Sequence, residues 1–167
     1  PIGAYGVSAE LARHLEEPPA LAGAPMESVG GVATGGTLYA NALSMAAARA
    51  ALEQVLLPHS YERAARLGGR LADGLDAIFA ETGLRWRAHR LYCRSGFTFG
   101  PDLPRNGAEA RSLADPALYH LIRIWMANRG VWESIASAGP TVSFAMDDSD
   151  IDFYLAHFRE LARTLTS

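Results

Sequence analysis

Three stretches of the chain place apolar residues three and four positions apart, which is the spacing of an amphipathic helix. They predict helices over 60–82, 116–129 and 149–165. The face of each helix that should pack in a core is apolar, while its other positions are mostly polar or small. The predicted core positions are Ala64, Leu67, Leu71, Leu75 and Ile78, then Leu118, Leu121, Ile122 and Trp125, then Ile151, Tyr154, Leu155, Phe158, Leu161 and Leu165.

Capping residues and helix breakers set the expected ends of these helices. Ser60 is the predicted N-cap of the first helix, and Gly83 is its predicted stop. Asp115-Pro116 predicts the start of the second helix, because aspartate caps well and proline suits the first helical position. Gly130 should end that helix. The last helix begins near Ser149 among four aspartates, which complement the positive end of the helix dipole.

The apolar spacing changes to an alternation after Gly83, which is typical of β-strands. We expect strands near 85–92, 96–99 and 141–146 in one mostly antiparallel sheet, and a short strand at Val131-Trp132. Ser95-Gly96 is expected to be a break or a bulge. Residues 100–114 are rich in proline, glycine and asparagine and predict a long loop. The C-terminal part is therefore expected to be an α/β domain.

The N-terminal part has a different pattern. A short helix is predicted from Ser8 to Leu15, followed by a long glycine- and proline-rich loop over 18–36. An alanine-rich helix is then predicted near 41–56, with Asn41 as its N-cap and Pro58 as the next breaker.

Gly35, Gly36 and Thr37 come just before this alanine-rich helix. A helix start offers unpaired backbone N–H groups and a positive dipole, glycines allow close approach, and threonine adds a hydroxyl. Together these features suit a phosphate site, although a glycine-rich loop that simply leads into a helix has the same pattern. The lysine of a P-loop is missing, and the glycines do not follow the dinucleotide-binding spacing.

Three segments resemble class III aminotransferases, which are pyridoxal-phosphate enzymes of fold type I. Gly36–Ala47 is similar to the family segment G-T-[FL]-x-G-N-P-L-A-M-A-A, with alanine at 40 and 42 where glycine and proline are usual. Pro1–Gly6 resembles the segment just after the catalytic lysine. Asn128–Glu133 and Gly139–Ser143, with the acidic start of the last helix, resemble the family's C-terminal region. Within the family, glutamate-1-semialdehyde 2,1-aminomutase and its aminotransferase relatives are the most similar group.

The resemblance implies a function and a domain division. Residues 1–45 would be the end of the large cofactor domain, and residues 46–167 would form the small C-terminal domain. Thr37 would bind the phosphate of pyridoxal 5'-phosphate in the neighbouring subunit, with Gly36 and Gly35 allowing close approach. This implies a homodimer that transfers or moves an amino group of a small amino-acid or amine substrate. The alternative is a non-catalytic α/β module of the same ancestry that serves dimerisation or binding.

All fifteen basic residues are arginines, so the chain contains no lysine. The Schiff-base lysine of such an enzyme is therefore expected upstream of Pro1, and we assign no catalytic residue within the chain. The opening Pro-Ile-Gly-Ala, without an initiator methionine, fits a start that is internal to a longer protein.

The composition of the chain also indicates which kinds of partner and metal site are not expected. A net charge of −3 favours neither nucleic acid nor an anionic membrane, and no apolar run approaches the roughly 20 residues of a membrane span. The single cysteine, Cys93, cannot form an internal disulfide, which fits the cytoplasm. The five histidines lack metal-site spacing, so no metal site is expected.

Three other side chains allow two interpretations each. Arg94 could bind a substrate carboxylate, or it is a solvated arginine at a strand end. Arg129 and Glu133 could shape substrate choice, although surface ion pairs are the favoured interpretation. Trp132, like Trp125, is expected to be a core residue.

Overall fold

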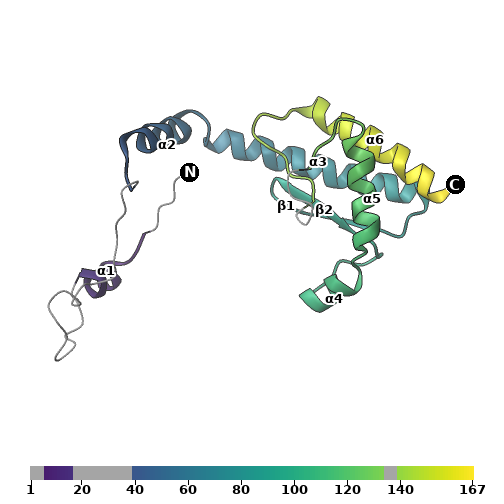
Figure 1. Ribbon diagram of the computed structural model, residues 1–167, viewed down its shortest axis with the longest axis horizontal. Coiled ribbons are helices and arrows are strands. Elements are labelled where there is room, and N and C mark those ends of the chain that lie inside the picture. Colours follow the sequence, from purple (N-terminus) through teal and green to yellow (C-terminus); the bar gives the residue numbers. More distant parts are fainter. Residues whose placement is uncertain (1–5, 17–38, 134–138) are drawn as a thin grey trace. The chain divides into compact units, whose positions relative to one another are not determined.

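A computed structural model describes residues 6–16, 39–133 and 139–167 (Figure 1). The chain divides into two compact units, Pro1–Gln54 and Val55–Ser167. The assignment of 1–45 and 46–167 to a large and a small domain stays a prediction.

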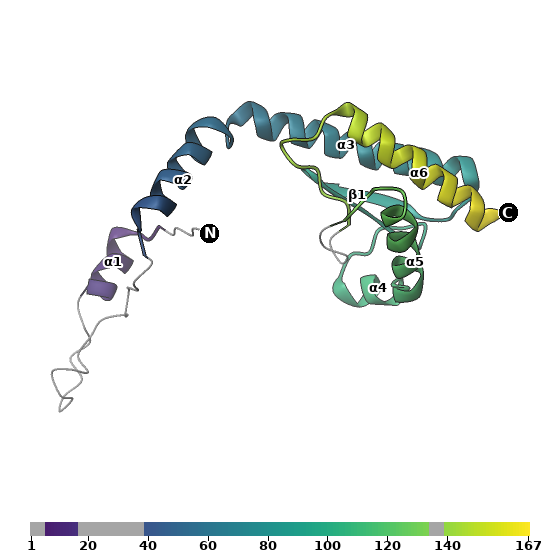
Figure 2. The same ribbon diagram turned by 45° about the horizontal axis from the view of Figure 1, so that its top comes forward.

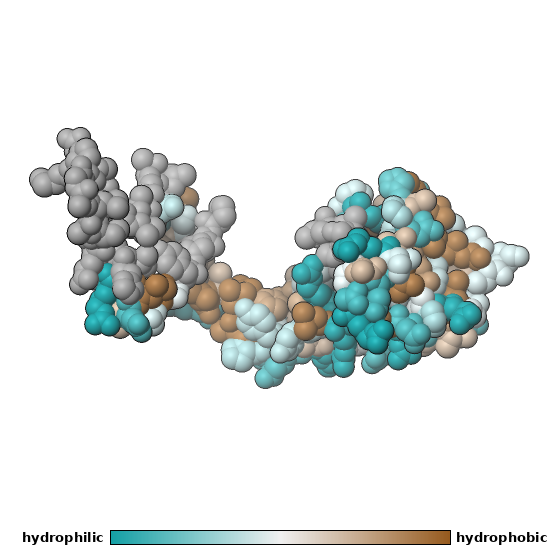
Figure 3. Space-filling view, turned by 90° about the horizontal axis from the view of Figure 1, so that it is seen from below, coloured by the Kyte–Doolittle hydropathy of each residue, from teal (hydrophilic) through white to brown (hydrophobic). Residues whose placement is uncertain are grey.

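The first unit contains two helices, α1 (Ala9–Glu16) and α2 (Ala42–Gln54), and both were predicted. Ser8 caps α1, because its Oγ accepts a hydrogen bond from the Leu11 N–H at 3.2 Å. Asn41 caps α2 in the same way, accepting from the Ser44 N–H at 2.9 Å. No residue of α2 is buried, and its apolar side chains are visible on the surface in Figure 3.

The second unit is built on a long helix, α3, which packs against a β-hairpin and against the C-terminal helix α6 (Figures 1 and 2). Helix α5 also packs on α6. The elements are α3 (Pro58–Thr82), β1 (Arg87–Leu91), β2 (Arg94–Thr98), α4 (Gly107–Ser112), α5 (Pro116–Ala127) and α6 (Asp148–Thr166).

Most helix ends follow the expected capping chemistry. Gly83 ends α3 in the left-handed conformation at φ 74°, and Asp115 caps α5 by accepting from the Leu118 N–H at 3.0 Å. The prediction for Ser60 was wrong. Pro58 occupies the first turn of α3 and Leu57 is the N-cap, so Ser60 lies buried inside the helix. Helix α6 begins one residue before Ser149, because Asp147 forms a capping box.

The predicted sheet is smaller than expected. Strands β1 and β2 form an antiparallel hairpin in which Ala88 faces Phe97. Residues 141–146 are not a strand, since Thr141 alone makes a bridge, to Arg94. Val131-Trp132 is not a strand either.

The positions of the turn and of the long loop also differ from the prediction. Ser95-Gly96 is not a bulge but is paired within β2. The hairpin turns earlier, at Tyr92, where φ is 53°. The predicted loop over 100–114 contains the short helix α4, which Asn106 caps.

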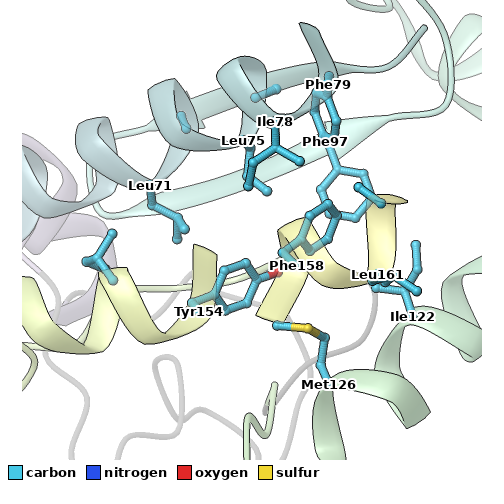
Figure 4. Packing of buried hydrophobic residues seen from close by; sticks show 14 of the residues in the cluster. Leu71, Leu75, Ile78, Phe79, Phe97, Ile122, Met126, Tyr154, Phe158 and Leu161 are labelled. Atoms are coloured by element: carbon cyan, nitrogen blue, oxygen red, sulfur yellow. The ribbon is translucent and has the colours of Figure 1, made fainter. Parts of the chain in front are cut away.

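The core lies between α3, the hairpin, α5 and α6 (Figure 4). Aromatic rings join the layers: the centroid of Phe97 on β2 lies 5.3 Å from that of Phe158 on α6 and 6.0 Å from that of Phe79 on α3. Leu121, a predicted core residue, is 47% exposed, and Met126 is the buried residue of α5 that the prediction missed. The residues labelled in Figure 4 are Leu71, Leu75, Ile78, Phe79, Phe97, Ile122, Met126, Tyr154, Phe158 and Leu161.

Close backbone approach fixes the hairpin on α3. A Cβ at Gly68 would lie 2.4 Å from the Tyr92 carbonyl oxygen, so only glycine fits there without movement. The Ser95 hydroxyl donates to the Gly68 carbonyl at 2.9 Å. Gly139 approaches the Ser95 carbonyl equally closely and has φ 68°. These contacts hold the start of β2 between α3 and residues 139–142.

Candidate functional site

The predicted phosphate residues Gly35, Gly36 and Thr37 lie outside the described residues. The nearest described feature is the start of α2, where Asn41 caps the helix. The first turn of a helix leaves backbone N–H groups that the helix cannot pair itself. The helix start that the phosphate prediction requires is therefore present four residues after Thr37.

Arg94 is the first residue of β2 and is exposed. Strand alternation places it on the face of the hairpin opposite to Ser95, which bonds to α3. Within the described part of the chain, no carboxylate pairs with the Arg94 side chain. Its guanidinium therefore remains available to an anion, and its role in substrate binding stays a prediction.

A pocket of about 570 Å³ opens beside the start of α6. Its walls come from residues 130–133, from residues 139–143 and from the first two turns of α6. Thr141, which bridges to Arg94, lies in this wall. Aromatic and apolar side chains form most of the lining, together with the carboxyl groups of Glu133 and Asp150.

Glu133 is the partly buried acid of this pocket. The Tyr154 hydroxyl donates to Glu133 Oε1 at 3.0 Å. Burial raises the pKa of Glu133 above its usual range, while the Tyr154 hydrogen bond and the charge of Arg123 act in the opposite direction. The Arg123 guanidinium also donates to the Glu133 backbone carbonyl at 3.1 Å and lies over the Trp132 ring, 5.4 Å from its centroid.

Tyr154 acts as a fixed donor to this carboxyl group. Burial, followed by the nearby charge of Glu133, raises the pKa of Tyr154 well above its usual range. Because the phenol stays protonated at physiological pH, it can stabilise a charged Glu133. The pair therefore holds a carboxylate at a defined place in the pocket wall.

The sequence interpretation did not predict the hydrogen bond between Glu133 and Tyr154. Glu133 was expected to form a surface ion pair, but it bonds to Tyr154 inside the protein. Arg129 does form such a pair, with both guanidinium contacts to Glu160 at 3.1 Å. Trp132 was expected in the core but is 76% exposed, whereas Trp125 packs against the core. Glu133 follows the apolar Val131 by two positions, and this is the one local signal that the acid lies near a core.

The described residues also bear on metals and membranes. They contain no cluster of three or more His, Cys, Asp or Glu side chains arranged to hold a metal ion. None of their helices combines the length and apolar character needed to cross a membrane.

Comparison with known proteins shows the family to which the chain is related. No family model matches it. Glutamate-1-semialdehyde 2,1-aminomutase 2 from Geobacillus kaustophilus is 32% identical over 157 residues, which cover 93% of this chain and 34% of that protein. The chain thus spans about a third of the length of the curated relatives that it matches. It is a class III aminotransferase-like segment.

Solved structures agree with the sequence relationship. A glutamate-1-semialdehyde aminomutase from Pseudomonas aeruginosa PAO1, in complex with PMP, matches with a TM-score of 0.74 and 26% identity, covering 87% of this chain and 31% of that one. An omega-transaminase from Sphaerobacter thermophilus has the same fold, with a TM-score of 0.73 and 20% identity over 95% of this chain and 34% of that one. The aminotransferase-like segment therefore has the α/β fold of pyridoxal-phosphate enzymes of fold type I, as predicted.

Proposed function

We propose that the protein containing this chain uses pyridoxal 5'-phosphate to transfer an amino group between small molecules, or to move it within one molecule. The observation that supports this most strongly is the 32% identity to a glutamate-1-semialdehyde aminomutase across 93% of the chain. Both an aminotransferase and an aminomutase fit this relationship. Because the chain covers a third of that relative, the activity belongs to the whole protein.

In this proposal the chain binds the cofactor phosphate. The Thr37 hydroxyl donates to a phosphate oxygen, and Gly36 and Gly35 let the phosphate approach the backbone. The N-terminus of α2, capped by Asn41, contributes a positive dipole. A phosphate dianion needs several donors, and this combination of groups provides them.

The cofactor, the lysine that carries it and the group that binds the substrate carboxylate are considered next. Bound pyridoxal phosphate supplies an electron sink for the reacting carbon. The chain contains no lysine, so in this proposal the lysine that carries it belongs to another part of the protein, upstream of Pro1 as the family resemblance implies. Arg94, which has no carboxylate partner among the described residues, holds the substrate carboxylate.

The proposed assembly follows from the proposed role of Thr37. If Thr37 binds the cofactor of the neighbouring subunit, the active protein is a homodimer in which each site is completed across a two-fold axis. A small amino-acid or amine substrate is the only other partner that the site requires. The single cysteine of this chain suits the reducing cytoplasm, and we propose this location for the protein.

The test is made on the full-length protein. We expect it to bind pyridoxal phosphate covalently, with visible absorbance, and to exchange amino groups with an amino donor or with glutamate-1-semialdehyde. Alanine in place of the upstream lysine should remove the covalent absorbance and the activity. A full-length protein that neither binds the cofactor nor moves an amino group would favour the non-catalytic α/β module instead.

A further inference from the structure

The turn of the β-hairpin contains a tyrosine in an unfavourable backbone conformation. Leu91 pairs with Arg94, so only Tyr92 and Cys93 connect β1 to β2. The favoured two-residue hairpin turns need a positive φ at their first position, which is why glycine, asparagine or aspartate usually stands there. Here the residue is Tyr92, with φ 53°. A bulky side chain is disfavoured in this conformation, so the turn would form more easily with glycine at position 92.

No contact of the Tyr92 side chain within the described residues accounts for this choice. The side chain is 77% exposed, and neither its ring nor its hydroxyl has a partner among the residues that the structure describes. The backbone carbonyl of Tyr92 does pack against α3 at Gly68, but any residue at position 92 has this carbonyl. Strained backbone of this kind is concentrated at ligand-binding and active sites. We therefore expect the Tyr92 ring to contact a molecule or segment outside the described residues.

Two exposed neighbours indicate the chemistry of that contact. Because Leu91 and Arg94 are directly opposed, their side chains lie on the same face of the hairpin. Leu91 is 69% exposed, and the Arg94 guanidinium has no carboxylate partner among the described residues. The hairpin tip, which we define as residues 91–94, thus offers a cation, an aliphatic side chain and an aromatic ring. This combination suits a carboxylate that is attached to a hydrocarbon.

The backbone of the hairpin tip is held on two sides. The Ser95 hydroxyl donates to the Gly68 carbonyl of α3 at 2.9 Å, and the Val142 N–H donates to the Cys93 carbonyl at 2.9 Å. Side chains on such a fixed backbone are positioned more precisely than side chains on a mobile loop. The hairpin tip can therefore present the ring of Tyr92 at a defined place although the turn is exposed.

We propose that Tyr92 contacts the substrate and contributes to its selection, its ring packing against the hydrocarbon part of the molecule whose carboxylate Arg94 binds. This inference rests on the proposed amino-group transfer and on the role that it gives to Arg94. It differs from a purely structural role in the sign of one effect. If the ring served the fold, its removal would destabilise the protein. If the ring serves the substrate, glycine at position 92 relieves the strain but weakens substrate binding.

The experiment compares Tyr92→Gly with Tyr92→Phe in the full-length protein. The midpoint of urea unfolding is measured without pyridoxal phosphate. KM and kcat are measured with the cofactor-loaded enzyme, using glutamate-1-semialdehyde, L-alanine, L-glutamate and 4-aminobutyrate as carboxylate-bearing substrates. We expect Tyr92→Gly to keep or raise the urea midpoint while it raises KM about three- to tenfold, which corresponds to the loss of one aromatic contact.

Two control variants accompany this comparison. Tyr92→Phe keeps both the ring and the backbone conformation, so its urea midpoint and KM should match those of the wild type. Leu103→Gly removes another exposed apolar side chain, from the loop beyond the opposite end of the hairpin, and should leave KM unchanged.

Three results would contradict the inference. A clearly lower urea midpoint for Tyr92→Gly would assign the ring to folding or to contacts with the rest of the protein. An active Tyr92→Gly enzyme with unchanged KM would overturn the inference and leave the proposed amino-group transfer intact. A wild-type protein that transfers no amino group from any donor would contradict the proposed transfer itself, and this inference with it.

Discussion

At the scale of single residues, burial decides what each charged side chain does. Arg129 and Glu133 lie four positions apart in one motif, yet Arg129 forms a surface pair with Glu160 whereas Glu133 bonds to the buried Tyr154. Spacing along the chain did not distinguish them. The difference arises from α6, which supplies a different partner to each residue from far along the sequence.

The raised pKa of Glu133 predicts a pH dependence of stability. Because its pKa is higher in the folded than in the unfolded protein, the folded state binds more protons between the two values. This contribution to the free energy of unfolding is fully present at low pH and is lost as the pH rises through the folded pKa. Glu133→Gln, which cannot titrate, should lack this loss.

Urea unfolding of the two proteins between about pH 4 and 8 measures this effect. The wild type minus Glu133→Gln difference in the free energy of unfolding should decrease as the pH rises. Other carboxylates titrate in both proteins and cancel in the difference. A difference that is constant or increases with pH would contradict the partly buried position of Glu133.

At the scale of elements, the sequence predicted helices better than strands. The faces of α3 and α6 were recognisable because their apolar residues are buried against other parts of the same chain. The alternation over 141–146 has another cause: Val142 is buried and Phe144 and Met146 pack on the core, although Thr141 alone is paired with β2. Alternating burial therefore does not require a ladder of hydrogen bonds.

The contact between α3 and the hairpin gives a stability prediction. Gly68→Ala should lower the free energy of unfolding by about 1–3 kcal/mol, because the new methyl group meets the Tyr92 backbone. Gly74→Ala in the same helix is the matched control. Its methyl group meets only the Leu155 side chain, which can move, and alanine favours the helix. Denaturant unfolding should give Gly68→Ala a clearly lower free energy of unfolding than Gly74→Ala. The reverse order would rule out this packing of the hairpin on α3.

The N-cap of α5 gives another stability prediction. Asp115→Ala removes the acceptor of the Leu118 N–H and should cost about 1 kcal/mol in the free energy of unfolding. Asp115→Asn keeps a capping oxygen and should cost much less. Thermal or urea unfolding of both variants tests the cap. Equal losses in the free energy of unfolding for Asp115→Ala and Asp115→Asn would refute it.

At the scale of the whole molecule, function came from resemblance and not from pattern. The glycines and threonine before α2 match several kinds of loop, and the family motif alone connects them to a cofactor. The sequence also did not predict what the apolar side chains of α2 contact. Leu43 is 82% exposed and Leu52 is 63% exposed, so these two side chains do not pack in a core among the described residues.

Assembly can be tested directly. If Thr37 completes a neighbouring site, the active full-length protein should sediment as a dimer or a larger assembly at assay concentrations. Sedimentation velocity with simultaneous activity measurement shows which species is active. An active monomer would exclude the shared site and leave the other proposals intact.

The central claim is that Thr37 anchors the cofactor phosphate, and titration of pyridoxal phosphate into full-length variants tests it most directly. Thr37→Ala removes one charge-assisted donor, worth roughly 1.5–3 kcal/mol, so the affinity should fall about ten- to a hundredfold. The fold should persist, and Thr37→Ser should bind almost as well as the wild type because it keeps the hydroxyl. Equal affinity for the wild type and Thr37→Ala would show that the phosphate binds elsewhere.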